Sequence, residues 1–285
     1  MVKIAVVQAG SVLYDTPATL AKLQQFARDA AGAKLILFPE AFVGGYPKGQ
    51  SFGAVVGSRT APGRDAFQRY FESAIAVPGP ETAPIGEIAA EVGAHIVTGA
   101  IERDGGTLYC TALHFDDTGR LIGRRRKLMP TASERLIWGM GDGSTLDVIA
   151  TPHGKVASVI CWENYMPMLR MAMYAGGVEL YCAPTVDDRD AWQPTMRHIA
   201  LEGRCFVLTA VQFTETIRGG SAIYGPLGEE IAAPVYGREA VLTAEIDLGA
   251  IARGKYDFDV VGHYARPDVF TLHVDRRVKQ AVRDS

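Results

Sequence analysis

Three reactive side chains, far apart in the chain, each follow a predicted strand. Cys161 comes directly after the apolar run 156–160, whose β-branched residues are typical of a buried strand. Glu40 follows the run 34–38, and Lys127 ends the basic run RRRK after another strand pattern. In open α/β folds, ligands bind at the carboxyl ends of strands. A thiol, a carboxylate and an ammonium there would supply a nucleophile, a base and a cation that stabilises developing charge.

The residues after Cys161 favour a reactive thiol. Asn164 is a candidate helix cap and Pro167 fits a first helical turn, so we expect a helix to begin just beyond the cysteine. Backbone N–H groups near a helix start favour the thiolate. A nucleophile would still need a base and a cation beside it in space, and sequence spacing does not show that.

Each candidate also has an ordinary structural explanation. A cysteine in apolar company, such as Cys161, is often a small buried side chain. Glu40 could be a solvated loop carboxylate, and Lys127 could lie on a solvated strand edge. Glu134 is a fourth candidate, but Thr131-x-x-Glu134 fits a capping box that satisfies a helix start. Both explanations stay open for all four residues.

The elements that must position these residues alternate between strand and helix. A strand at Val2–Gln8, a helix over 16–31 capped by Asp15, and a strand at 34–38 predict parallel strands with a right-handed crossover. The other predicted helices span 66–73, 82–92, 191–202 and a segment after 164, and the other predicted strands span 95–101, 108–115, 121–126, 144–149, 155–160, 178–183, 205–212, 221–224, 230–234 and 240–247. Strands this apolar need cover on both faces, so we expect a four-layer α/β domain with two sheets inside.

The composition excludes several classes of protein. The 285 residues are 48% hydrophobic and 21% charged, which is typical of a globular protein with a core. The net charge of −3 does not favour binding to nucleic acid or to an anionic membrane. No run is long enough to span a membrane and no signal-peptide pattern is visible, so we expect a cytoplasmic protein. The four cysteines are widely spaced and the six histidines form no close pair, so we expect neither a disulfide framework nor a metal site.

Three long motifs occur in order around the candidate residues. FPEAFVGGYPKG contains Glu40, GRRRKLMPTASERLIWGMGDGS contains Lys127, and ICWENYMPMLR contains Cys161. They resemble motifs of the nitrilase superfamily, specifically of its nitrilase branch. The later segments RHIALEGRCFVL, GGSAIYGPLGEEIA and DVVGHYARPDVF resemble the same branch, so the resemblance covers nearly the whole chain.

The resemblance implies roles for four residues. Glu40 would be the general base, Lys127 the cationic stabiliser, Cys161 the nucleophile and Glu134 an assisting carboxylate. The Trp162-Glu163-Asn164 sequence resembles enzymes that act on a carbon–nitrogen triple bond, whereas amidase relatives carry other residues there. The implied reaction converts an organic nitrile to a carboxylic acid and ammonia without a metal or organic cofactor.

The same resemblance implies an αββα sandwich, with a single domain over 1–285 and a charged tail at 275–285, assembled as a homodimer or higher homo-oligomer. The alternatives are an amide-hydrolysing or cyanide-hydrating enzyme of the same architecture and a catalytically silent binding protein.

The sequence does not indicate which organic group the nitrile carries. Candidate pocket aromatics, each equally explained by core packing, are Phe42, Tyr46, Trp138, Trp162 and Trp192.

Overall fold

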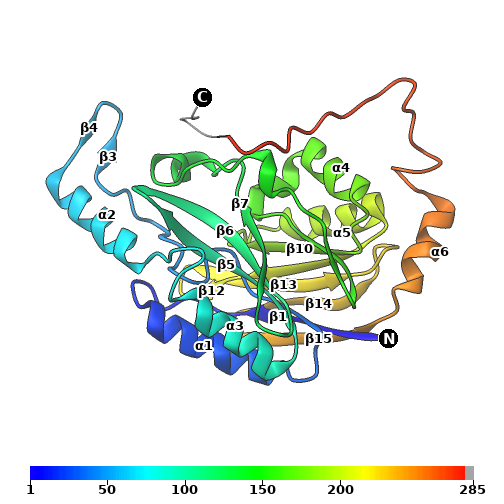
Figure 1. Cartoon of the computed structure of the whole chain (residues 1–285), viewed down its shortest axis with the longest axis horizontal. Helices are drawn as coiled ribbons and strands as arrows, with labels where there is room; N and C mark the ends of the chain where they lie inside the picture. Colours follow the sequence, from blue (N-terminus) through cyan, green and yellow to red (C-terminus); the bar gives the residue numbers. More distant parts are fainter. Residues whose placement is uncertain (280–285) are drawn as a thin grey trace.

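Two β-sheets pack face to face in the computed structural model, which describes residues 1–279 (Figure 1). The first sheet has the strand order β15-β1-β2-β5-β6-β7, in which β1, β2 and β5 are parallel neighbours. Its strands are β1 (Val2–Gln8), β2 (Leu35–Leu37), β5 (His95–Asp104), β6 (Thr107–Phe115), β7 (Leu121–Arg126) and β15 (Ala240–Ile246). Part of the predicted tail 275–285 lies outside the described residues.

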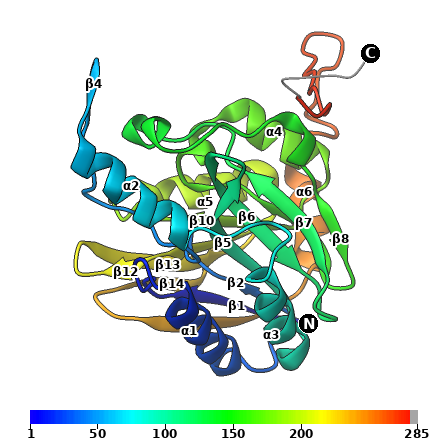
Figure 2. The same cartoon turned by 60° about the vertical axis from the view of Figure 1, so that its left-hand side comes forward.

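The second sheet has the strand order β12-β13-β11-β10-β9-β8, and β14 pairs with β13. Its strands are β8 (Ile149–Thr151), β9 (Gly154–Ser158), β10 (Leu180–Thr185), β11 (Phe206–Val211), β12 (Phe213–Thr214), β13 (Ile217–Tyr224) and β14 (Glu230–Tyr236). β9, β10 and β11 are parallel, so their carboxyl ends share one edge. A small hairpin of β3 (Ala54–Val55) and β4 (Ser58–Arg59) projects from the body (Figure 2).

Helices cover the outer faces of both sheets. The covering helices are α1 (Thr16–Asp29) and α3 (Thr82–Val92) on the first sheet and α4 (Pro167–Ala175) and α5 (Trp192–Gly203) on the second. α2 (Ala61–Ser73) packs on a separate cluster with Cys161, and α6 (Gly249–Asp257) contacts the layer between the sheets. Figure 2 shows α1 and α3 on the side of the first sheet and α4 and α5 on the side of the second. Within residues 1–279, no helix has the length and apolar character needed to cross a membrane.

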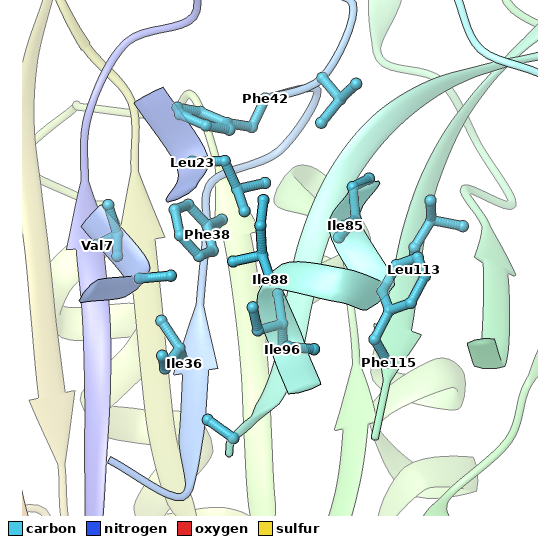
Figure 3. Close-up of a cluster of buried hydrophobic side chains, with 14 of the residues drawn as sticks. Val7, Leu23, Ile36, Phe38, Phe42, Ile85, Ile88, Ile96, Leu113 and Phe115 are labelled. Atoms are coloured by element: carbon cyan, nitrogen blue, oxygen red, sulfur yellow. The ribbon is translucent and has the colours of Figure 1, made fainter. Parts of the chain in front are cut away.

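Three apolar layers hold the four structural layers together. Between the first sheet and its helices, Leu23 of α1 and Ile88 of α3 pack among strand residues such as Val7 (Figure 3). Between the sheets, Val6 belongs to the same cluster as Leu208. A third cluster joins α4 and α5 to the second sheet. The predicted four-layer sandwich is therefore confirmed.

Several element boundaries differ from the prediction, and for two of them the contacts give the reason. α2 begins at Ala61 instead of 66, because the Thr60 hydroxyl accepts the Gly63 N–H at 3.2 Å and so satisfies the helix start. The predicted strand 144–149 is wrong over most of its length. Asp142 accepts the Ser144 N–H at 2.9 Å and starts a 3₁₀ turn, so the strand begins only at Ile149.

A buried histidine pair connects the two sheets. His95 Nε2 lies 3.3 Å from His114 Nδ1, and His114 Nε2 lies 2.8 Å from the hydroxyl of Ser158 on β9. Burial lowers the pKa of His95 to about 4 and that of His114 well below its ordinary value. Both imidazoles are therefore neutral at pH 7 in the folded protein.

This pair makes the fold sensitive to acid. An unfolded histidine takes up a proton below pH ~6.5, whereas His95 stays neutral in the folded protein down to about pH 4. The free energy of unfolding therefore falls as the pH drops from 6.5 toward 4, and His95 accounts for about 3 kcal/mol of the loss. Urea titrations of wild type and His95→Gln between pH 7 and 4.5 measure this. We expect a flatter pH dependence for the variant, and parallel curves would contradict the assignment.

Candidate active site

Cys161 lies at a sharp bend directly after β9. In the β9–β10 pair, Ser158 lies opposite Cys182, and the Val159 N–H donates to the Cys182 carbonyl at 2.9 Å. The strand ends because Cys161 adopts a left-handed backbone, with φ +52°, and begins the 3₁₀ turn Cys161–Tyr165. Positive φ is strained for a residue with a side chain, so surrounding contacts must hold this bend.

Asn164 holds the bend and does not cap a helix, so that prediction was wrong. Its side-chain amide donates to the carbonyls of Val159, at 2.9 Å, and Cys161, at 2.7 Å. Its Oδ1 accepts the hydroxyl of Tyr181 at 2.9 Å. α4 begins later, at Pro167, because the 3₁₀ turn occupies the residues after the cysteine.

Glu40 is fully buried just beyond β2. Its segment lies close against β5, where the Gly99 N–H donates to the Pro39 carbonyl at 3.0 Å. A Cβ atom on Gly99 would lie 2.4 Å from both the Pro39 oxygen and the Ala41 nitrogen, so this approach requires glycine. From the second sheet, the Val186 N–H donates to Glu40 Oε2 at 3.2 Å.

The Lys127 ammonium lies between two carboxylates. Its Nζ donates to Glu40 Oε1 at 2.7 Å and to Glu134 Oε2 at 2.8 Å, and the lysine side chain is fully buried. Glu134 Oε2 also accepts the Thr131 N–H at 2.6 Å, so its position fits both the helix-start and the pocket interpretations. The Tyr46 hydroxyl donates to the other oxygen of Glu134 at 2.8 Å.

The Cys161 thiol is held neutral, whereas the sequence predicted conditions that favour a thiolate. Burial raises the pKa of the thiol well above its ordinary value, and the negative charge of Glu40 raises it further. The charge of Lys127 and a hydrogen bond from Thr185 oppose this rise without cancelling it. The sulfur therefore needs a base that removes its proton.

Glu40 has the properties of that base. Burial raises the pKa of Glu40, while the Lys127 ammonium and a hydrogen bond with Cys161 lower it in part. For Lys127, burial lowers the pKa, but the negative charges of Glu40 and Glu134 act against burial, and the pKa lies well above the ordinary value. The lysine thus keeps its charge, and Glu40 is a stronger base than a solvated carboxylate.

A pocket of about 300 Å³ opens onto the sulfur. Its lining consists of Tyr46, Lys48, Thr131, Glu134, Cys161, Trp162, Val186, Asp187, Asp188 and Arg189. Trp162 is oriented at the pocket by a hydrogen bond from its indole N–H to Asp187 at 2.9 Å. The guanidinium of Arg189 stacks 4.4 Å from the same indole ring. Two of the five predicted pocket aromatics, Tyr46 and Trp162, therefore line this space, whereas Phe42 is fully buried in the apolar layer between the first sheet and its helices.

The other two predicted aromatics lie elsewhere. Trp138 is buried beneath the site, with its ring 5.6 Å from the Lys127 ammonium and 5.7 Å from the ring of Tyr46. Trp192 is fully buried in the apolar layer outside the second sheet, and its indole N–H donates to Thr209 at 2.8 Å. For Trp192, core packing was the correct alternative. Within residues 1–279 no cluster of three or more metal-ligating side chains occurs.

Cys110 and Glu163 are not among the four candidate residues from the sequence, yet both contact segments of the site. Cys110, which we would assign to the core, places its Sγ 3.6 Å from Glu40 Oε1. The β6–β7 hairpin explains this, because Thr111 pairs with Arg126 and thus sets Cys110 opposite Lys127, whose N–H donates to the Cys110 carbonyl at 2.8 Å. A bulge at His114 and Phe115 shifts this register by one residue, so the predicted hairpin extended from its turn would have set Cys110 opposite Arg126 instead.

Glu163 connects the segments that carry the lysine and the cysteine. Its Oε1 accepts the Leu128 N–H at 2.6 Å, and its Oε2 accepts the Ile160 N–H at 3.1 Å. Arg125 donates to Oε1 at 3.0 Å, and both side chains of this pair are buried. The basic run is thus no simple solvated strand edge, because Arg125 fixes β7 to the bend at the nucleophile.

A buried carboxylate and ammonium act on a buried thiol in this αββα sandwich, and comparisons with known proteins identify the family. Residues 3–256 match the family model described as carbon–nitrogen hydrolase. The chain therefore belongs to the carbon–nitrogen hydrolase family. Nit3 of Saccharomyces cerevisiae, a member of branch 10 of the nitrilase superfamily, shares the fold with a TM-score of 0.76 at 22% identity, over 92% of this chain and 96% of that one.

Within the family, the chain belongs to the nitrilase branch. It is 55% identical to a nitrilase of Bradyrhizobium diazoefficiens, over 98% of this chain and 94% of the relative. It is 54% identical to an aliphatic nitrilase of Sinorhizobium fredii, over 98% and 97%. A bifunctional nitrilase/nitrile hydratase of Nicotiana tabacum is 53% identical, over 96% of this chain and 86% of the relative.

The Arg125–Glu163 pair should be essential for stability. Glu163→Gln leaves a buried guanidinium without a counter-charge, and we expect the free energy of unfolding to fall by about 3–5 kcal/mol. The double variant Arg125→Met/Glu163→Gln removes both charges and should recover part of that loss. Urea unfolding of the single and double variants measures both effects. Equal stability of wild type and Glu163→Gln would show that the pair does not support the fold.

Proposed function

We propose that this nitrilase hydrolyses organic nitriles to carboxylic acids and ammonia, with Cys161 as nucleophile, Glu40 as general base and Lys127 as cationic stabiliser. The observation that carries the proposal is the buried cluster beside the pocket. Lys127 Nζ lies 2.7 Å from Glu40 and 2.8 Å from Glu134, Glu134 lines the same pocket as Cys161, and the charges of Glu40 and Lys127 both act on the Cys161 thiol. The relatives named above, at 53–55% identity, support nitriles as the substrate class.

The first half of the reaction forms a thioimidate. Glu40 removes the proton of Cys161 as the sulfur attacks the nitrile carbon. The new S–C bond forms while one π bond of the triple bond breaks, and its electron pair moves to the nitrogen. Lys127 donates a proton to this nitrogen, and the Glu134 carboxylate, 2.8 Å away, keeps the ammonium oriented. Glu40 then passes the proton that it took from Cys161 to Lys127, 2.7 Å away, so the carboxylate and the ammonium are both restored before water enters.

The second half consumes two water molecules. One water, deprotonated by Glu40, adds to the thioimidate carbon, and the tetrahedral product expels ammonia to leave a thioester. A second water then hydrolyses the thioester, releasing the carboxylic acid and restoring the thiol. If the tetrahedral product expels the sulfur instead, an amide leaves, which is the hydratase outcome.

Positioning and charge stabilisation must supply most of the catalysis. A free thiol with a pKa of about 8.5 is about 3% ionised at pH 7, so complete ionisation would gain only about 2 kcal/mol. Enzymes lower barriers by ~8–23 kcal/mol. Orientation of the nitrile and stabilisation of the developing nitrogen anion by Lys127 must therefore contribute more than activation of the sulfur.

We also propose a homodimer or larger homo-oligomer. Support comes from apolar side chains exposed on α4 and on the segment that crosses it, since Met168 is 69% exposed and Phe270 is 78% exposed. Scattered exposed apolar residues are normal, but a group of them on one face favours an interface. A cytoplasmic location stays a prediction.

The shape of the cation should matter as much as its charge. Lys127→Arg replaces a compact ammonium with a planar fork in a fully buried site between two carboxylates. We expect a folded protein whose kcat is at least about a hundredfold lower. Steady-state kinetics and circular dichroism check this, with Lys34→Arg on the surface as the matched control. Near-normal turnover of Lys127→Arg would refute the role of the lysine.

Ammonia release should depend on Cys161 alone among the cysteines. A panel of aliphatic, aromatic and arylacetonitriles is assayed for ammonia, acid and amide with wild type, Cys161→Ala and Cys182→Ala. Cys182 is buried between the sheets and serves as the control. We expect acid and ammonia from wild type and from Cys182→Ala, and neither from Cys161→Ala. Equal ammonia from all three proteins would disprove the nucleophile, and amide as the sole product would assign a hydratase.

A further inference from the structure

The hydroxyl of Thr185 lies beside the sulfur of Cys161. Ser158 of β9 lies opposite Cys182 of β10, so three residues further along the parallel strands Cys161 comes next to Thr185. Thr185 Oγ1 lies 3.2 Å from Cys161 Sγ, and the Thr185 side chain is fully buried. Within residues 1–279, this is the one hydrogen bond in which the sulfur of Cys161 is the acceptor.

A second hydrogen bond sets the direction of the first. The Asp187 N–H donates to Thr185 Oγ1 at 2.9 Å, so the hydroxyl oxygen already acts as an acceptor on that side. Its proton is then available to the sulfur, which is the acceptor in contact with it. Because the threonine is buried, bulk water does not compete for this proton.

We propose that Thr185 is a further catalytic residue, whose hydroxyl donates a hydrogen bond to Cys161 Sγ and stabilises negative charge on the sulfur. This inference rests on the proposed role of Cys161 as nucleophile. Hydrogen bonds to charged groups are stronger than those to neutral groups, so the hydroxyl favours the ionised sulfur over the thiol.

The sulfur carries negative charge at two points in the proposed reaction. In the first, its proton moves to Glu40 while the S–C bond forms. In the second, the C–S bond of the thioester breaks, the sulfur takes the electron pair, and Glu40 returns the proton. Thr185 keeps its own proton throughout. Burial and the charge of Glu40 disfavour charge on the sulfur, so a donor in direct contact has a specific effect.

The test measures the reactivity of the thiol without a nitrile. Iodoacetamide alkylation of the intact protein is followed from pH 6 to 10 in wild type, Thr185→Val, Thr185→Ala and Thr185→Ser. Cys110, Cys182 and Cys205 are fully buried, and Cys161→Ala gives the background rate. Loss of the hydroxyl should slow alkylation at pH 7 by about ten- to a hundredfold and move the profile to higher pH. The Ser variant should stay near wild type.

A merely structural role would give another pattern. Displacement of the pocket loop changes the rate by a similar factor at every pH, and it affects Thr185→Ser as well. Thr209→Val is the matched control, because it removes a buried hydroxyl of the neighbouring strand that bonds Trp192 and Ala183 instead of the sulfur. An unmoved profile in whichever of Thr185→Val and Thr185→Ala folds, or an equal effect in Thr185→Ser, would overturn the proposal.

Kinetics on nitriles separate this inference from the proposed function. We expect kcat of Thr185→Val to fall roughly in parallel with the alkylation rate, with KM little changed. If wild type releases no ammonia from nitriles while alkylation still depends on the hydroxyl, the proposed substrate class fails and the role of Thr185 stands. If Cys161→Ala abolishes turnover but removal of the Thr185 hydroxyl changes neither rate, this inference alone fails.

Discussion

The buried ion cluster of Lys127, Glu40 and Glu134 is the interaction on which the rest of the site depends. Removing an ammonium from water costs several kcal/mol unless opposite charges and hydrogen bonds compensate it. Here the compensation comes from two carboxylates at 2.7 and 2.8 Å, which follow different elements of the chain. The first sheet must therefore hold the segments after β2 and β7 in register, because otherwise the Lys127 ammonium would lose its contact with Glu40.

The sulfur belongs to the second sheet, so the chemistry requires the two sheets to be aligned as well. The apolar layer between them gives close packing but little directional information. Hydrogen bonds across the interface fix the position of one sheet relative to the other. Val186 donates to Glu40, and Glu163 accepts amides from both the lysine and the cysteine segments. A small relative shift of the sheets would break these bonds and separate the base from the thiol.

Sequence patterns were sufficient for much of the fold and for the places of Glu40, Lys127 and Cys161 near strand ends. The strand after which Glu40 or Cys161 appears is visible from its apolar run, and Asp15 marks the start of α1 by its cap. Strand patterns do not specify which strands are neighbours in space. Thr185 and Glu163 act across such neighbours, so their contacts could not be predicted from spacing. The place of Cys110 beside Lys127 likewise depends on a bulge at His114 and Phe115, which shifts the register of the predicted hairpin by one residue.

The charge arrangement also explains why the site holds a neutral thiol at rest. A permanent thiolate beside Glu40 would place two negative charges together in a buried space, and one ammonium shared with Glu134 could not balance both. In the proposed reaction, transfer of the proton during attack avoids that state, since charge moves from the sulfur through the substrate carbon to its nitrogen, near the ammonium. The site thus favours charge at the place where the reaction develops it, and that selectivity for the transition state distinguishes a catalyst from a site that only binds.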